Sequence, residues 1–115
     1  MDKDRPIEEV CALLKSLLKD DTNQIIFCTG RVEDYREKTI EQINKILKGS
    51  KNIDIDSCLY MRPQGDFRKD FMVKRDLYKR MIFDGFNPVL VFEDKITVVE
   101  MWKEMGLKCL RVTGA

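Results

Sequence analysis

Apolar residues recur along the chain at two alternating spacings. In four segments they fall three or four positions apart, which is the spacing of one buried helix face: residues 6–19, 33–48, 70–83 and 95–105. Between these segments lie short apolar runs with many β-branched and aromatic residues: 24–28 (QIIFC), 57–61 (SCLYM), 88–92 (PVLVF) and 108–112 (KCLRV). The pattern predicts four helices that alternate with four strands.

Residues typical of helix ends support the first two helices. Asp4 can cap the first helix and Pro6 suits its first turn, while Gly49 and Ser50 supply a stop for the second. The large apolar residues of the last helix are predicted to belong to the core: Met101, Trp102 and Met105.

The alternation predicts an α/β fold, Rossmann-like, with about four parallel strands, four helices and three α/β/α layers. The chain has 115 residues and no internal repeat or linker, so residues 1–115 are expected to form a single domain. Ligands of such sheets bind beyond the carboxyl ends of the strands. The loops that follow the strands are therefore where chemistry is expected.

Charge and hydropathy narrow the classes of partner. The 21 basic and 20 acidic residues leave a net charge of +1, so no overall field attracts the protein to nucleic acid or to a membrane. No apolar run approaches the length of a membrane span, and the N-terminal segment MDKDRPIEEV lacks the features of a signal peptide. We expect a cytoplasmic protein with no membrane partner.

The lack of histidine narrows the chemistry further. Nucleophilic systems that need histidine are excluded, and catalysis would depend on carboxylates, Lys, Tyr, Cys or a metal. The four cysteines form no CxxC pair and are expected to be free, buried thiols: Cys11, Cys28, Cys58 and Cys109.

The first candidate loop is the segment Cys28-Thr29-Gly30-Arg31, which is predicted to end a strand and begin a helix. A hydroxyl, free backbone N–H groups and a guanidinium can converge on an anion at such a helix N-terminus. A strand followed by Thr-Gly is also ordinary turn chemistry, so this motif alone leaves both interpretations open.

The second candidate loop begins a basic stretch, residues 62–80, with four more positive than negative charges. Arg62, Arg68 and Lys69 fall in the predicted loop and are candidate phosphate ligands. For the helical half we prefer a solvated face with pairs four residues apart: Asp70 with Lys74, and Asp76 with Arg80.

The third candidate loop follows the strand PVLVF. Glu93 and Asp94 are adjacent carboxylates there, of which one can help to hold Mg²⁺ and the other can cap the next helix.

Taken in order, these segments resemble the haloacid dehalogenase superfamily, in particular the 3'-phosphatase domain of phage-type polynucleotide kinase. The strings QGDFRKDFMVKRDLYKRMIF and VLVFEDKITVVEMWKEMGLKCLRV resemble its third and fourth motifs and its closing helix and strand, and IIFCTGR resembles its second motif. The resemblance implies a haloacid dehalogenase-type core. It also implies that Thr29 is the phosphate-binding hydroxyl, that Lys74, or else Lys69, is the third-motif cation, and that Glu93 and Asp94 help to hold Mg²⁺.

The chain departs from the family in its first motif, an apolar strand that ends in DxDGT and carries the nucleophile. Asp2-Lys3-Asp4 has the spacing but no preceding strand, and Asp54-Ile55-Asp56 precedes a strand instead of ending one. The domain is therefore interpreted as truncated. In the family this strand lies between the strands that correspond to 24–28 and 88–92, so these must close up or another chain must fill the gap. We expect a homo-oligomer for this reason.

Two hypotheses on function follow. The first is a non-catalytic domain that binds a phosphorylated nucleotide without a cofactor, with a viral sponge for a host immune nucleotide, in the host cytoplasm, as its suggested role. Tyr60 or Phe67 would then stack on a base, although packing is the preferred role of both. The alternative is a Mg²⁺-dependent nucleotide or polynucleotide 3'-phosphatase, for which nucleic acid becomes a partner. A decayed fragment with no ligand remains a third interpretation.

Overall fold

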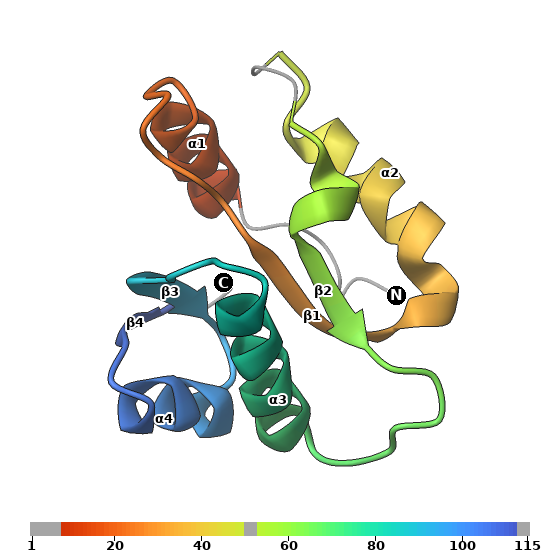
Figure 1. The fold of residues 1–115 in the computed structure, drawn as a ribbon. Coiled ribbons are helices and arrows are strands. Elements are labelled where there is room, and N and C mark those ends of the chain that lie inside the picture. Colours follow the sequence, from red (N-terminus) through yellow and green to blue (C-terminus); the bar gives the residue numbers. More distant parts are fainter. Residues whose placement is uncertain (1–7, 50–52, 113–115) are drawn as a thin grey trace. The chain divides into compact units, whose positions relative to one another are not determined.

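The computed structural model describes residues 8–49 and 53–112 (Figure 1). Its helices and strands follow the predicted order: α1 (Glu8–Leu17), β1 (Phe27–Val32), α2 (Arg36–Ile46), β2 (Leu59–Arg62), α3 (Asp70–Phe83), β3 (Leu90–Glu93), α4 (Ile96–Glu104) and β4 (Lys108–Arg111). Short 3₁₀ turns precede α2 and β2: η2 (Glu33–Tyr35) and η3 (Ile55–Cys58). The mixed α/β class is confirmed. Asp4, Pro6 and Ser50, which were expected at helix ends, lie outside the described residues.

The strands pair in two separate sheets. β1 pairs with β2, and β3 pairs with β4 in parallel, with Leu90 opposite Lys108 and Glu93 opposite Arg111. Within the described residues no pairing joins β1 to β3, so the predicted continuous four-stranded sheet is not confirmed. The interruption falls where the resemblance places the family's first strand.

The chain divides into two compact units. One comprises the described residues up to Phe27 together with Asp34–Leu59, and the other comprises Cys28–Glu33 and the chain from Tyr60 onward. The first unit holds α1, α2 and η3, and its buried apolar side chains include Ile43, Leu47 and Ile55. Every candidate ligand residue belongs to the second unit.

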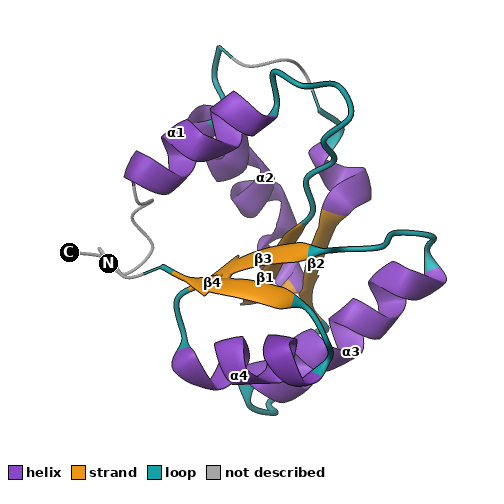
Figure 2. Ribbon diagram, turned by 90° about the vertical axis from the view of Figure 1, so that its left-hand side faces the viewer, coloured by secondary structure: helices purple, strands orange, loops and turns teal. Residues whose placement is uncertain are grey.

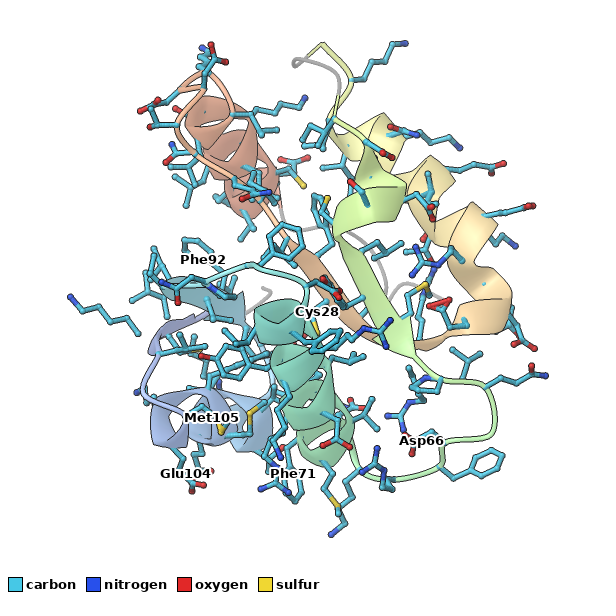
Figure 3. The ribbon with its side chains drawn as sticks, in the orientation of Figure 1. Cys28, Asp66, Phe71, Phe92, Glu104 and Met105 are labelled. Atoms are coloured by element: carbon cyan, nitrogen blue, oxygen red, sulfur yellow. The ribbon has the colours of Figure 1, made fainter. Side chains whose placement is uncertain are left out.

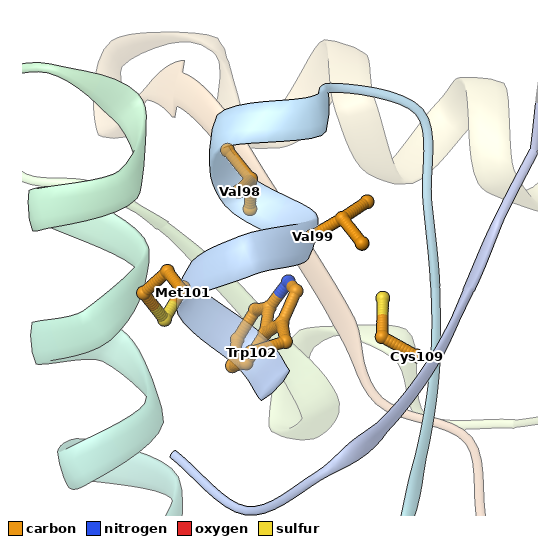
Figure 4. Close-up of a cluster of buried hydrophobic side chains, with 5 residues drawn as sticks. All are labelled: Val98, Val99, Met101, Trp102 and Cys109. Atoms are coloured by element: carbon orange, nitrogen blue, oxygen red, sulfur yellow. The ribbon is translucent and has the colours of Figure 1, made fainter. Parts of the chain in front are cut away.

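The core of the second unit is built around α4. This helix contacts α3, β3 and β4, and α3 and α4 lie side by side below the β3–β4 sheet in Figure 2. Five buried residues form the central cluster shown in Figure 4: Val98, Val99, Met101, Trp102 and Cys109. Met105 packs against this cluster, so the predicted core positions of α4 are confirmed.

The opposite face of the β3–β4 sheet is apolar but exposed within this unit. Leu90 and Leu110 have 47% and 54% of their surface exposed, whereas Cys109, on the other face, is buried. The second helix layer of a three-layer arrangement is therefore not confirmed. No helix in the described ranges is long and apolar enough to cross a membrane.

The first strand differs from its prediction at both ends. Residues 24–28 were expected to be extended, but β1 runs from Phe27 to Val32 and so contains Thr29, Gly30 and Arg31. The next α-helix begins only at Arg36, after η2. The prediction that Thr29–Arg31 form a loop at a helix N-terminus is therefore wrong. Glycine is required at residue 30 of this strand because a neighbouring side chain approaches its backbone closely, as described below.

Candidate functional site

Lys74 and Glu93 form an ion pair in the interior of the second unit. Lys74 Nζ donates to Glu93 Oε1 at 3.0 Å, and only 10% and 7% of the two side chains are exposed. Trp102 Nε1 donates to the same oxygen at 3.3 Å. The backbone N–H groups of Asp94 and Lys95 donate to Glu93 Oε2 at 3.2 and 3.4 Å. Both carboxylate oxygens are thus held by donors.

Three different elements bring this pair together. Lys74 lies on the buried face of α3 beside Val73, Glu93 is the last residue of β3, and Trp102 belongs to α4. The sequence identified Lys74 and Glu93 as separate candidates, and it assigned Trp102 to the core alone. Because a buried indole N–H requires an acceptor, the Trp102 position could have signalled a polar group within the core.

Asp70, at the start of α3, connects two cations. Arg62 Nη2 donates to its Oδ1, and Lys95 Nζ donates to its Oδ2. The hydrogen bond from Lys95 is the main cause that lowers the pKa of the Asp70 carboxyl and raises the pKa of Lys95. Sequence reasoning missed this role for Asp70, because it considered only partners on the same helix.

The expected pairs along α3 are corrected in the same way. Asp70 pairs with Arg62 and Lys95, not with Lys74. Asp76 pairs with Arg68 at 2.8 Å, and Arg80 pairs with Asp84 at 3.4 Å. Asp70 and Asp76 thus pair with residues outside α3, because folding brings those charges closer than the next helical turn, whereas Arg80 keeps a partner four residues away, at the end of its own helix.

Gly30 of β1 lies directly against Asp70. A β-carbon at residue 30 would lie 2.8 Å from Asp70 Oδ1, which is closer than such atoms approach in proteins. This oxygen is the one held by Arg62, so it cannot move without loss of an ion pair. The contact explains why residue 30 has no side chain and shows that β1 and the start of α3 are fitted closely.

Arg62 holds the loop between β2 and α3. It is the last residue of β2, not a loop residue as predicted. Its Nε donates to the Gly30 carbonyl at 2.8 Å, and its Nη1 donates to the carbonyls of Asp66 at 3.1 Å and Arg68 at 2.6 Å. The same guanidinium therefore binds β1, Asp70 and the loop.

Arg68 is already neutralised by carboxylates. It pairs with Asp66 at 2.7 Å and with Asp76 at 2.8 Å. These contacts raise the pKa of Arg68 and lower the pKa of Asp66 to about 2. Lys69 is exposed, and no ion pair with a carboxylate engages it within the described part of the chain.

The remaining candidates on β1 are only partly buried. The Arg31 backbone N–H donates to Thr29 Oγ1 at 3.2 Å, which leaves the hydroxyl proton of Thr29 as a donor. Cys28, the preceding residue, packs against the α4 cluster (Figure 3), and burial raises the pKa of its thiol to about 12. The nearby Lys74 ammonium opposes this increase. The four cysteines are all free, as predicted, but only Cys58 and Cys109 are fully buried, whereas Cys11 and Cys28 are partly exposed.

Comparison with known proteins assigns the chain to a family. The family model described as "Polynucleotide kinase PNKP phosphatase domain" matches residues 1–115. The chain belongs to this family. The resemblance deduced from the second, third and fourth motifs is thereby confirmed.

A viral relative supports the same kinship. The chain is 33% identical over 84 residues to a "Putative bifunctional polynucleotide kinase/RNA ligase" of Autographa californica nuclear polyhedrosis virus. The match covers 72% of this chain and 11% of the relative, so the chain spans about a tenth of the length of that protein.

Mg²⁺ is the ion that the resemblance to this phosphatase family implies. In residues 8–49 and 53–112, no three His, Cys, Asp or Glu side chains lie together so that they could hold a metal. Asp70 and Glu93 already accept donors from cations, and Asp94 is an exposed carboxylate beside them. The described residues therefore do not form a magnesium site by themselves.

Proposed function

We propose that this chain binds the terminal phosphate of a phosphorylated polynucleotide or nucleotide, and that the described residues bind it without hydrolysing it. The observation that carries the proposal is the buried Lys74–Glu93 pair at the end of β3. Buried ion pairs contribute little net stability, because desolvation offsets their attraction, so stability alone is a weak reason for this pair. Because the family is one of phosphatase domains, a phosphate is the ligand that we expect this pair to contact.

Several donors are available to a phosphate near this pair. The Lys74 ammonium has three N–H groups, of which Glu93 takes one. Thr29 retains its hydroxyl proton on β1, and Lys69 contributes an exposed positive charge at the end of the loop. Arg62 and Arg68 hold the loop in place, so they support the ligand site instead of supplying its free cations.

Binding without turnover follows from the state of the carboxylates. An aspartyl-phosphate mechanism needs an unengaged carboxylate that can attack phosphorus. Asp70 accepts hydrogen bonds from two cationic side chains. Glu93 accepts hydrogen bonds from an ammonium, an indole N–H and two backbone N–H groups. Asp94 is exposed to water. None of the three described candidates offers a desolvated nucleophile.

A second function is favoured by the interrupted sheet. In the described part of the chain, β1 and β3 each pair on one side only. A strand inserted between them would bring its own carboxylates to the same end of the sheet and could convert the site into a Mg²⁺-dependent 3'-phosphatase. The viral relative is described as a polynucleotide kinase/RNA ligase, so a polynucleotide is the first substrate to test.

A small phosphate-binding domain with viral kinship suits a sponge that sequesters a host immune nucleotide in the host cytoplasm. Such a sponge would prefer a free cyclic dinucleotide or an ADP-ribose derivative to a polynucleotide end.

The deciding experiment measures binding and turnover together. The protein is mixed with 5'-labelled oligonucleotides that end in a 3'-phosphate or a 3'-hydroxyl, with Mg²⁺ present, and anisotropy and released inorganic phosphate are recorded. We expect tighter binding of the 3'-phosphate with no catalytic phosphate release. The double variant Lys74→Met/Glu93→Gln, which leaves no unpaired buried charge, should abolish this preference, while Lys79→Met, which changes an exposed lysine of the same helix, should not.

The other outcomes are equally informative. Catalytic phosphate release would replace the binding proposal by the phosphatase. The protein is also incubated with a mixture of free nucleotides that includes cyclic dinucleotides and ADP-ribose derivatives. If it removes one of them from solution and releases it intact when heated, the sponge is identified. The proposal would be overturned if the protein bound both oligonucleotides equally and bound none of the free nucleotides.

A further inference from the structure

The loop between β2 and α3 carries a fully exposed aromatic side chain. Phe67 has 94% of its surface exposed, so the predicted packing role is wrong for this residue. Tyr60, by contrast, is buried, donates a hydrogen bond to Asp84 Oδ2 at 2.7 Å and packs edge-on against Phe86. The same prediction is therefore confirmed for Tyr60.

The backbone on both sides of Phe67 is held. Arg62 Nη1 donates to the carbonyl of the preceding residue, Asp66, and to that of the following residue, Arg68. Asp66 Oδ1 also accepts the Arg68 backbone N–H at 3.1 Å, and the two side chains form an ion pair. Asp66 is labelled in this loop in Figure 3. An isolated exposed phenyl ring is common on protein surfaces, but here hydrogen bonds among Arg62, Asp66 and Arg68 hold the backbone on both sides of the ring.

The same arginine connects Phe67 to the candidate phosphate site. Arg62 donates to the carbonyls around Phe67 with Nη1 and to Asp70 with Nη2, while its Nε binds the Gly30 carbonyl. Lys69, the exposed cation, follows Phe67 by two residues. An exposed aromatic ring on a held stretch of backbone, with a cation two residues away, suits the binding of single-stranded nucleic acid by base stacking and phosphate contact.

We propose that Phe67 stacks on a nucleobase near the phosphorylated end of a single-stranded polynucleotide. This inference rests on the proposed function and specifies its ligand: the recognised phosphate is attached to a nucleoside whose base contributes to affinity. Because every base has a planar face, stacking on Phe67 adds affinity without sequence preference.

The test removes the base and the ring separately. One oligonucleotide ends in a nucleoside 3'-phosphate, and a second has abasic residues at its last two positions but keeps the 3'-phosphate. We expect the wild-type protein to bind the first about tenfold more tightly, and Phe67→Ala to lose this difference while its affinity for the abasic ligand stays unchanged. The control is Phe83→Ala, which changes another exposed phenylalanine at the far end of α3, a helix about 20 Å long.

A spectroscopic variant provides a direct readout. The natural Trp102 is buried, so Phe67→Trp adds an exposed indole whose fluorescence should change with the base-bearing ligand and not with the abasic one. If wild type binds both ligands equally, or Phe67→Ala keeps the full difference, the stacking proposal is overturned while phosphate binding stands. If wild type binds neither ligand, both the proposed function and the stacking proposal fail.

Discussion

Lys74 and Glu93 are 19 residues apart in sequence, yet the lysine ammonium lies 3.0 Å from a glutamate oxygen and both side chains are almost completely buried. The pair joins the third helix to the end of the third strand. Each charge compensates the desolvation of the other, and Trp102 and two backbone N–H groups complete the environment of Glu93.

Removal of one charge from this pair should be costly. Lys74→Met leaves the Glu93 charge buried without its cation and should lower the free energy of unfolding by about 3–5 kcal/mol. The double variant Lys74→Met/Glu93→Gln buries no charge and keeps an acceptor for Trp102, so it should recover most of that loss. Urea denaturation measures both. A Lys74→Met cost no larger than that of Lys79→Met would show that the pair is not buried as described.

Gly30 should tolerate a methyl group only if Asp70 is removed. Gly30→Ala places a β-carbon 2.8 Å from Asp70 Oδ1 and should cost about 1–3 kcal/mol as the carboxylate is displaced. In an Asp70→Ala background the same substitution should cost nothing. A double-mutant cycle on unfolding free energies measures this coupling. Additive effects of the two substitutions would contradict the close contact.

The contribution of Asp70 to stability should depend on pH. The hydrogen bond from Lys95 holds the pKa of Asp70 below its ordinary value of 3.8, so the folded state favours the ionised form. The stability difference between wild type and Asp70→Asn should be constant above about pH 5 and should shrink as the pH falls through the lowered pKa. Denaturation at several pH values measures it. Asp34→Asn, an exposed control, should show no such trend, and a difference that grows in acid would refute the assignment.

The unpaired sides of β1 and β3 should be covered in solution. Exposed strand edges favour association, so we propose that two or more copies assemble through them. Light scattering at micromolar concentration should give a mass of at least twice the 13.5 kDa of one chain. A monomer at this concentration would disprove the expectation.

The local pattern of the sequence was sufficient for much of the fold. α3 begins and ends where its apolar spacing predicts, at Asp70 and Phe83. The motifs around it identify the family correctly and include both Lys74 and Glu93. β1 was placed too early, because Thr29-Gly30 reads as a turn until the neighbouring Asp70 is considered.

The sequence alone determined the order of helices and strands, the α/β class and the phosphatase family, because spacing and motifs are properties of neighbouring residues. Tertiary structure decided which charges meet. With 41 charged residues in 115, local rules favoured partners one helical turn apart, whereas folding joined Arg62 and Lys95 to Asp70 and Lys74 to Glu93. Ion pairs depend on distance in space, which is set by packing between elements and not by separation along the chain.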